Sequence, residues 1–185
     1  MNVPNTLTII RLFMVPAFVL FYVMGIYEHW SNGLPISAII FALAAITDFL
    51  DGYIARKYNQ ITDFGKLADP LADKMMQLTA IGCLSFSRKL SVWVFVVFVI
   101  KEIALLLGSA QLLAFHKYVV YSKWSGKIAT VILFLAIIAI IWMDIPYEWA
   151  NRLMLVCVIL TLVAFFNYIQ IYFKVKENIR QKKEE

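Results

Sequence analysis

The chain has 185 residues, of which 62% are hydrophobic and only 16% are charged. Soluble domains are closer to half apolar and a quarter charged, so this composition excludes an ordinary soluble domain and predicts a chain that folds in lipid. The formal net charge is only +5, and the basic residues form no dense stripe, which excludes a nucleic-acid-binding protein.

Six apolar segments are long enough to cross a bilayer, because a helix of about 20 residues spans the hydrocarbon core. In chain order they cover residues 7–27, 35–56, 66–87, 90–115, 126–143 and 149–173. Long apolar runs are typical of helices rather than of alternating barrel strands. We therefore predict an all-α integral membrane protein, with six transmembrane helices around a polar cavity open to the cytoplasmic side. Residues 1–173 form one membrane domain and residues 174–185 a charged cytoplasmic tail.

Lysine and arginine predict the orientation of these segments, since both are enriched in cytoplasmic loops. With six crossings, both termini lie on one side of the membrane. That side receives Arg56, Lys57, Lys66, Lys117, Lys123, Lys174, Lys176, Arg180, Lys182 and Lys183. The opposite side receives Arg88, Lys89 and Arg152. Both termini are therefore predicted to be cytoplasmic.

Four aspartates lie in or beside the second and third segments, where carboxylates are costly and mark functional sites. Asp48 and Asp51 share one helix face, and so do Asp69 and Asp73. A short connection makes these helices antiparallel neighbours, so both faces can line one cavity. Converging carboxylates repel one another unless cations hold them, and hard divalent ions prefer oxygen ligands. The pattern predicts a site for two Mg²⁺ or Mn²⁺ ions that orients a phosphate-bearing substrate.

Small residues and a cation share the first of these faces. Gly52 and Ala55 leave room for a ligand to approach the backbone, and Arg56 can bind phosphate oxygens through its planar fork. An alternative interpretation is purely structural: the aspartates would form buried ion pairs with Arg56, Lys66 and Lys74.

Together these residues form the pattern Asp-x2-Asp-Gly-x2-Ala-Arg-x8-Gly-x3-Asp-x3-Asp, with eight fixed residues over positions 48–73. It resembles the signature of the CDP-alcohol phosphotransferase family, whose length and six-helix layout are also similar. The resemblance implies a homodimeric enzyme that transfers a substituted phosphate from a CDP-linked donor to an alcohol and releases CMP. It also implies that Asp48, Asp51, Asp69 and Asp73 bind two metal ions, with Asp73 as the general base. The residues implied for the CDP site are Asn5, Thr8, Asp48, Asp51, Gly52, Ala55, Arg56 and Gly65.

The opening residues resemble a branch of that family, the bacterial phosphatidylglycerophosphate synthases, which often begin with Pro-Asn-x-Leu-Thr-x-x-Arg. This branch takes CDP-diacylglycerol as donor and sn-glycerol 3-phosphate as acceptor, in the bacterial cytoplasmic membrane. An acceptor phosphate needs cations, for which the candidates are Arg11, Lys101, Lys123 and Lys127.

Three of these four cations also have a competing interpretation. Arg11 could extend to the lipid headgroups. Lys101 could form an ion pair with Glu102, and Lys123 could anchor the cytoplasmic side. Lys127, one helical turn after Lys123, is the strongest candidate for the phosphate.

Two alternative functions remain. Many members that use glycerol phosphate carry arginine where this chain has Lys101, which leaves open a cardiolipin synthase of the same family with phosphatidylglycerol as acceptor. A divalent-cation transporter could use the same aspartates as an ion pathway. It predicts carboxylates along the whole bilayer, however, whereas these cluster toward one face.

Overall fold

The structure, a computed structural model, describes the backbone of residues 3–57, 63–116, 124–143 and 145–184. Side chains are described for residues 6–48, 50, 71–105, 107, 126, 128–143, 145–167 and 169–170. Within these ranges the chain is all-helical, as its apolar runs predict. The helices are α1 (Val3–Tyr27), α2 (Gly33–Lys57), α3 (Asp63–Phe86), α4 (Val92–His116), α5 (Trp124–Trp142) and α6 (Tyr147–Glu184).

The helix ends differ from the predicted segments by a few residues, except at the C-terminus. α6 continues through Glu184, so the predicted charged tail, residues 174–184, continues the last helix. The reason is local: between Tyr147 and Glu184 the chain has no glycine or proline, and its polar end is rich in lysine, glutamate and glutamine, which favour helix.

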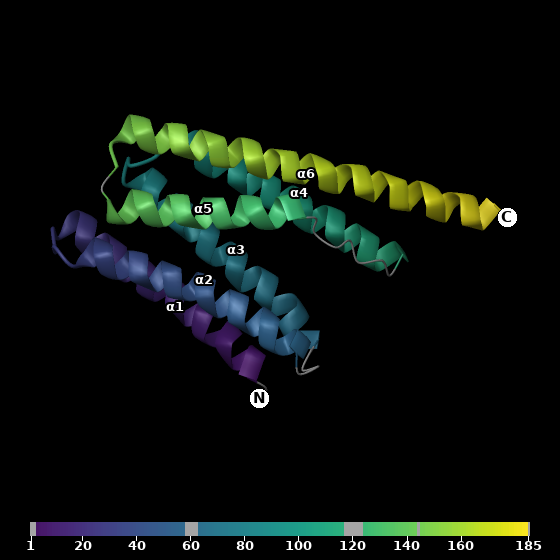
Figure 1. Ribbon diagram of the computed structural model, residues 1–185, viewed down its shortest axis with the longest axis horizontal. Coiled ribbons are helices and arrows are strands. Elements are labelled where there is room, and N and C mark those ends of the chain that lie inside the picture. Colours follow the sequence, from purple (N-terminus) through teal and green to yellow (C-terminus); the bar gives the residue numbers. More distant parts are fainter. Residues whose placement is uncertain (1–2, 58–62, 117–123, 144, 185) are drawn as a thin grey trace.

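The helices run alternately in opposite directions (Figure 1). The turns between α1 and α2, α3 and α4, and α5 and α6 lie together at one end, and both chain ends point away from them. α1 packs on α2 and α3, α4 packs on α3 and α6, and α5 packs on α2 and α6. The even number of helices thus places both termini toward the same end of the bundle.

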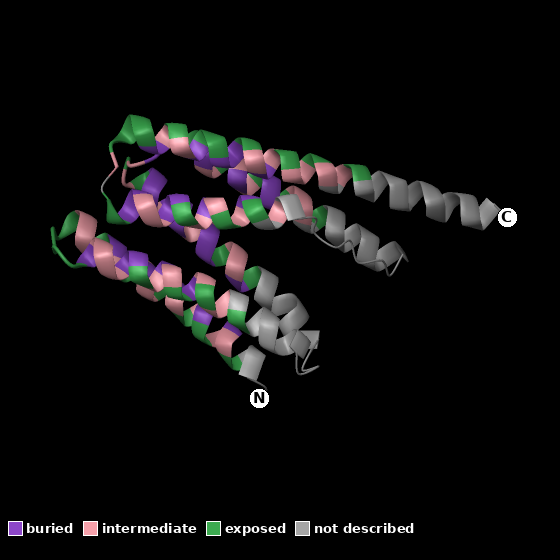
Figure 2. Cartoon of the chain, in the orientation of Figure 1, coloured by how far each residue is buried: buried purple, intermediate pink, exposed green. Residues whose placement is uncertain are grey.

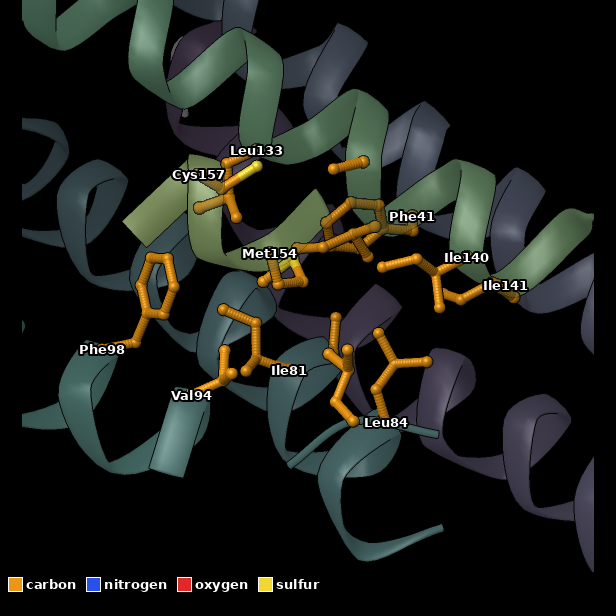
Figure 3. Close-up of a cluster of buried hydrophobic side chains, with 14 of the residues drawn as sticks. Phe41, Ile81, Leu84, Val94, Phe98, Leu133, Ile140, Ile141, Met154 and Cys157 are labelled. Atoms are coloured by element: carbon orange, nitrogen blue, oxygen red, sulfur yellow. The ribbon is translucent and has the colours of Figure 1, made fainter. Parts of the chain in front are cut away.

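Apolar side chains from all six helices fill the core. Figure 3 shows Phe41 from α2 close to Ile140 from α5, with Ile81 and Leu84 from α3 nearby. Val94 and Phe98 from α4 and Met154 and Cys157 from α6 complete this cluster. The core therefore joins the two halves of the chain.

The outward faces of the helices are also apolar, which is the reverse of a soluble protein. Figure 2 shows exposed residues along the outer faces of the bundle. They include large side chains such as Phe13, Leu20, Ile100 and Leu135. Within the described residues, Thr6–Tyr27 and Tyr147–Asn167 are each long and apolar enough to cross a membrane. An apolar surface of this extent fits contact with lipid.

Side-chain hydrogen bonds tie the turns together at one end of the bundle. The hydroxyl groups of Tyr22 and Ser87 are 2.7 Å apart, which links α1 to the segment after α3. The backbone N–H of Ser91 donates to Oδ1 of Asn151 at 3.0 Å, and the Ser91 hydroxyl lies 2.6 Å from that of Tyr147. The start of α6 is thereby fixed to the turn before α4.

Two glycines let α1 and α2 meet backbone to backbone near their shared turn. A Cβ atom placed on Gly33 would lie 2.5 Å from the Cα of Gly25, a distance that real side chains do not reach. Glycine is therefore required at this contact, and the turn between the two helices is tight.

Candidate active site

Eight polar or charged residues are buried in the described part of this apolar bundle. They are Thr8, Arg11, Ser37, Gln77, Ser85, Lys101, Glu102 and Thr161. A polar group removed from water costs free energy unless it is paired, and a charge costs more. The buried charges therefore identify where the fold maintains a specific polar site.

Arg11 on α1 and Asp48 on α2 form an ion pair, with 2.9 Å between NH1 of the arginine and Oδ1 of the aspartate. With a rise of 1.5 Å per residue, they lie roughly 24 Å and 22 Å along their helices from the α1–α2 turn, so packing brings them to one level. The Arg11 side chain is only 1% exposed, whereas that of Asp48 is 41% exposed. Arg11 thus lies beside a motif aspartate, and the alternative that it extends to the lipid headgroups is wrong.

Asp73 on α3 lies within electrostatic range of both members of this pair. Its carboxylate is repelled by that of Asp48 and attracted by the guanidinium of Arg11. The two aspartate-bearing helix faces therefore approach each other at the motif positions whose side chains are described. Gln77 lies one helical turn after Asp73 on α3 and is also buried, although the motif does not include it.

A second group of charges joins α3 to α4. Lys74 Nζ donates to Oε1 of Glu102 at 3.2 Å, and Lys101 Nζ contacts the same oxygen at 2.5 Å. Lys101 also lies over the ring of Phe98, 5.3 Å from its centre. The ion pair of Lys101 with Glu102 is thus confirmed, while Lys74 adds a partner from another helix.

Several predicted site residues lie where the structure describes no side chains. They are Asn5, Asp51, Gly52, Ala55, Arg56, Gly65, Asp69, Lys123 and Lys127. Those in 51–57 and 63–70 belong to helical backbone of α2 and α3, but the predicted cavity between them depends on their side chains. Thr8 is described and buried, one turn before Arg11 on α1.

The described donors fit a site for hard divalent ions. Asp48 and Asp73 supply carboxylate oxygens that repel each other, and a cation placed between such groups relieves that repulsion. Among the described side chains, no group of three histidine, cysteine, aspartate or glutamate residues gathers in one place. The side chains of the other two motif aspartates, Asp51 and Asp69, are not among those that the structure describes.

Comparison with known proteins supports the same chemistry. A family model described as CDP-alcohol phosphatidyltransferase matches residues 1–164. The chain belongs to this family. Members of the CDP-alcohol phosphatidyltransferase family are membrane-embedded and generally use divalent metal ions. The prediction of an enzyme rather than a cation transporter is therefore confirmed: the chain is a phosphatidyltransferase.

Relatives within the CDP-alcohol phosphatidyltransferase family carry one recurrent name, CDP-diacylglycerol–glycerol-3-phosphate 3-phosphatidyltransferase. One from Bacillus subtilis is 32% identical over 180 residues, covering 90% of this chain and 93% of the relative. One from Wigglesworthia glossinidia brevipalpis is 36% identical over 149 residues, covering 78% of this chain and 79% of the relative. One from Rickettsia typhi is 46% identical over 84 residues, covering 45% of this chain and 43% of the relative.

Proposed function

We propose that this enzyme transfers the phosphatidyl group of CDP-diacylglycerol to sn-glycerol 3-phosphate, giving phosphatidylglycerophosphate and CMP. The observation that carries the proposal is the similarity to the Bacillus subtilis relative, which extends over nearly the whole of both chains and whose name states this reaction. The opening motif and the buried cations near Asp73 support the same acceptor.

The proposed topology has six membrane crossings, with both termini and the active site on the cytoplasmic side of a bacterial cytoplasmic membrane. The alternating helix directions and the apolar outer faces support this arrangement (Figures 1 and 2). We also propose a homodimer, on the basis of the family resemblance.

The donor is proposed to bind between α2 and α3. Its CDP moiety contacts Asn5, Thr8, Asp48, Asp51, Gly52, Ala55, Arg56 and Gly65. When held by Asp48, Asp51, Asp69 and Asp73, two Mg²⁺ or Mn²⁺ ions supply the positive charge that neutralises the donor's pyrophosphate. Arg11 orients Asp48 through their ion pair, so that this carboxylate faces the same site.

Asp73 is the proposed general base. Its carboxylate accepts the proton of the acceptor hydroxyl while the hydroxyl oxygen forms a bond to the β-phosphorus of the donor. The bond from that phosphorus to the bridging oxygen breaks, and CMP leaves with the electron pair. Asp73 suits this role because it lies within electrostatic range of Asp48 and of the cations on α1, α3 and α4.

Cations are proposed to hold the phosphate of the acceptor. The candidates are Arg11, Lys101, Lys123 and Lys127. Lys127→Ala is expected to raise the KM for glycerol 3-phosphate about ten- to hundredfold, the loss of one charge-assisted hydrogen bond, while the KM for the donor changes little. An unchanged acceptor KM would show that Lys127 is outside the pocket.

The proposed reaction is tested by supplying the purified protein in detergent with CDP-diacylglycerol, Mg²⁺ and one acceptor at a time. Glycerol 3-phosphate, phosphatidylglycerol and uncharged glycerol are compared, with CMP and the lipid product identified by mass spectrometry. The expected product is phosphatidylglycerophosphate, formed in a one-to-one ratio with CMP. Cardiolipin formed from phosphatidylglycerol, without use of glycerol 3-phosphate, would instead establish a cardiolipin synthase.

A further inference from the structure

Glu102 is the most completely buried carboxylate of the described site, and neither the aspartate motif nor the proposed chemistry gives it a role. Its side chain is only 3% exposed, and one of its oxygens accepts hydrogen bonds from both Lys74 and Lys101. Because the two ammonium groups share one oxygen, they lie side by side although they come from α3 and α4. The carboxylate therefore fixes the distance between two cations.

This group lies deep in the bundle and next to the candidate base. Lys74 is roughly 18 Å along α3 from the α3–α4 turn, and Lys101 is roughly 14 Å along α4 from it, which explains why they meet. Lys74 follows Asp73 in the chain, and Lys101 is within electrostatic range of the Asp73 carboxylate. An acceptor whose hydroxyl reaches Asp73 can thus place a nearby phosphate against the lysines.

The charges of the group are not balanced by its own members. Two ammonium groups and one carboxylate leave one positive charge, and the carboxylate of Asp73, the proposed base, lies within electrostatic range of both lysines. A purely structural bridge between α3 and α4 needs only one lysine. Each ammonium has three N–H donors, and Glu102 takes one from each, so both lysines retain donors for another anion.

We propose that Glu102 is a positioning residue that holds Lys74 and Lys101 together as the binding site for the acceptor's phosphate. The inference rests on the proposed function, in which the acceptor carries a phosphate near Asp73. Two ammonium groups held at a fixed distance can each donate a charge-assisted hydrogen bond to a different oxygen of one phosphate. Without the carboxylate the two ammonium groups repel each other and separate, so they no longer bind one phosphate together.

The experiment compares wild type with Glu102→Gln and Glu102→Asp by steady-state kinetics of CMP release. Gln keeps the size of the side chain but removes its charge, and Asp keeps the charge on a shorter stem. We expect Glu102→Gln to raise the acceptor KM about tenfold, with the donor KM changed less than about twofold, and Glu102→Asp to raise the acceptor KM by about threefold. If Glu102→Gln cannot be purified in folded form, the acceptor KM of Glu102→Asp alone decides whether Glu102 positions the lysines.

Two controls separate positioning from general damage. Leu133→Ala empties a buried core position on α5, a helix that carries none of these three charges, so it lowers the melting temperature without changing the ratio of acceptor to donor KM. A double-mutant cycle combines Glu102→Gln with Lys74→Met. If Glu102 acts through Lys74, the combined rise in acceptor KM falls well short of the product of the two single rises.

The outcomes distinguish this inference from the proposed function. An acceptor KM that is unchanged or lowered in Glu102→Gln overturns the inference, because the carboxylate would then be a neutral bystander or a competitor for the lysines. An equal rise in the KM for the donor and for the acceptor also overturns the inference. So does a double-mutant cycle in which the two substitutions raise the acceptor KM independently. If the wild type uses phosphatidylglycerol instead of glycerol 3-phosphate, the proposed function fails, and the same KM ratio measured with phosphatidylglycerol decides the role of Glu102.

Discussion

The ion pair between Arg11 and Asp48 predicts that the two residues differ in their cost of substitution. Arg11 is almost fully buried, whereas Asp48 is partly open to solvent. Asp48→Asn removes the anionic partner from a buried guanidinium and should cost about 3 kcal/mol, the lower end for a broken buried pair, because one side of the pair is accessible. Arg11→Met leaves a carboxylate that water can reach, and should cost about 1 kcal/mol.

The assay is thermal unfolding in detergent, followed by circular dichroism, with a chelator present so that metal binding at Asp48 makes no contribution. For a chain of this length, 1 kcal/mol corresponds to about 2–4 °C in Tm. Asp48→Asn should therefore lower Tm by about 6–12 °C and Arg11→Met by about 2–4 °C. The double variant should recover most of the larger loss, because it leaves no buried charge without its partner. Additive losses in the double variant would refute this reasoning.

Three further predictions concern the metal site, the base and the helix contact. Chelation should abolish CMP release and added Mg²⁺ or Mn²⁺ should restore it; full turnover in excess chelator would contradict the two-metal site. Asp73→Asn should lower kcat about 10²–10⁴-fold while weakening donor binding less than Asp48→Asn does, and equal loss of donor binding would make Asp73 mainly a metal ligand. Gly33→Ala places a methyl group against the Gly25 backbone and should cost about 1–3 kcal/mol, seen as a lower Tm, whereas Gly82→Ala meets only a movable ring and should cost less.

The helical fold could be predicted from the sequence because each apolar segment has the length that a bilayer requires. The length of α6 does not follow from hydropathy, which falls where the membrane segment is predicted to end. It follows from helix propensity, which continues through the polar residues to Glu184.

For the site, spacing alone predicts which aspartates share a helix face, and one aspartate from each face, Asp48 and Asp73, lies within electrostatic range of the other. The partners of the buried cations, by contrast, could not be predicted from residue spacing. Whether Arg11 meets Asp48 or a headgroup depends on how α1 and α2 are rotated against each other, which periodicity does not specify. Glu102 is adjacent to Lys101 in the chain, but its second partner, Lys74, comes from another helix and is set by packing.

The close contact of Gly25 with Gly33 has a consequence for biosynthesis of the protein. It lets α1 and α2 close into a hairpin, in which Arg11 and Asp48 can neutralise each other before any later helix has been made. Each of these charges alone would cost about 2.5–3.5 kcal/mol at the centre of an inserting segment. In the proposed topology, the first two helices should therefore enter the membrane together, with Arg11 and Asp48 paired. Asp48→Lys in the full chain should reduce the fraction inserted, as measured by protease protection of newly made protein, and unchanged insertion would show that the helices enter one at a time.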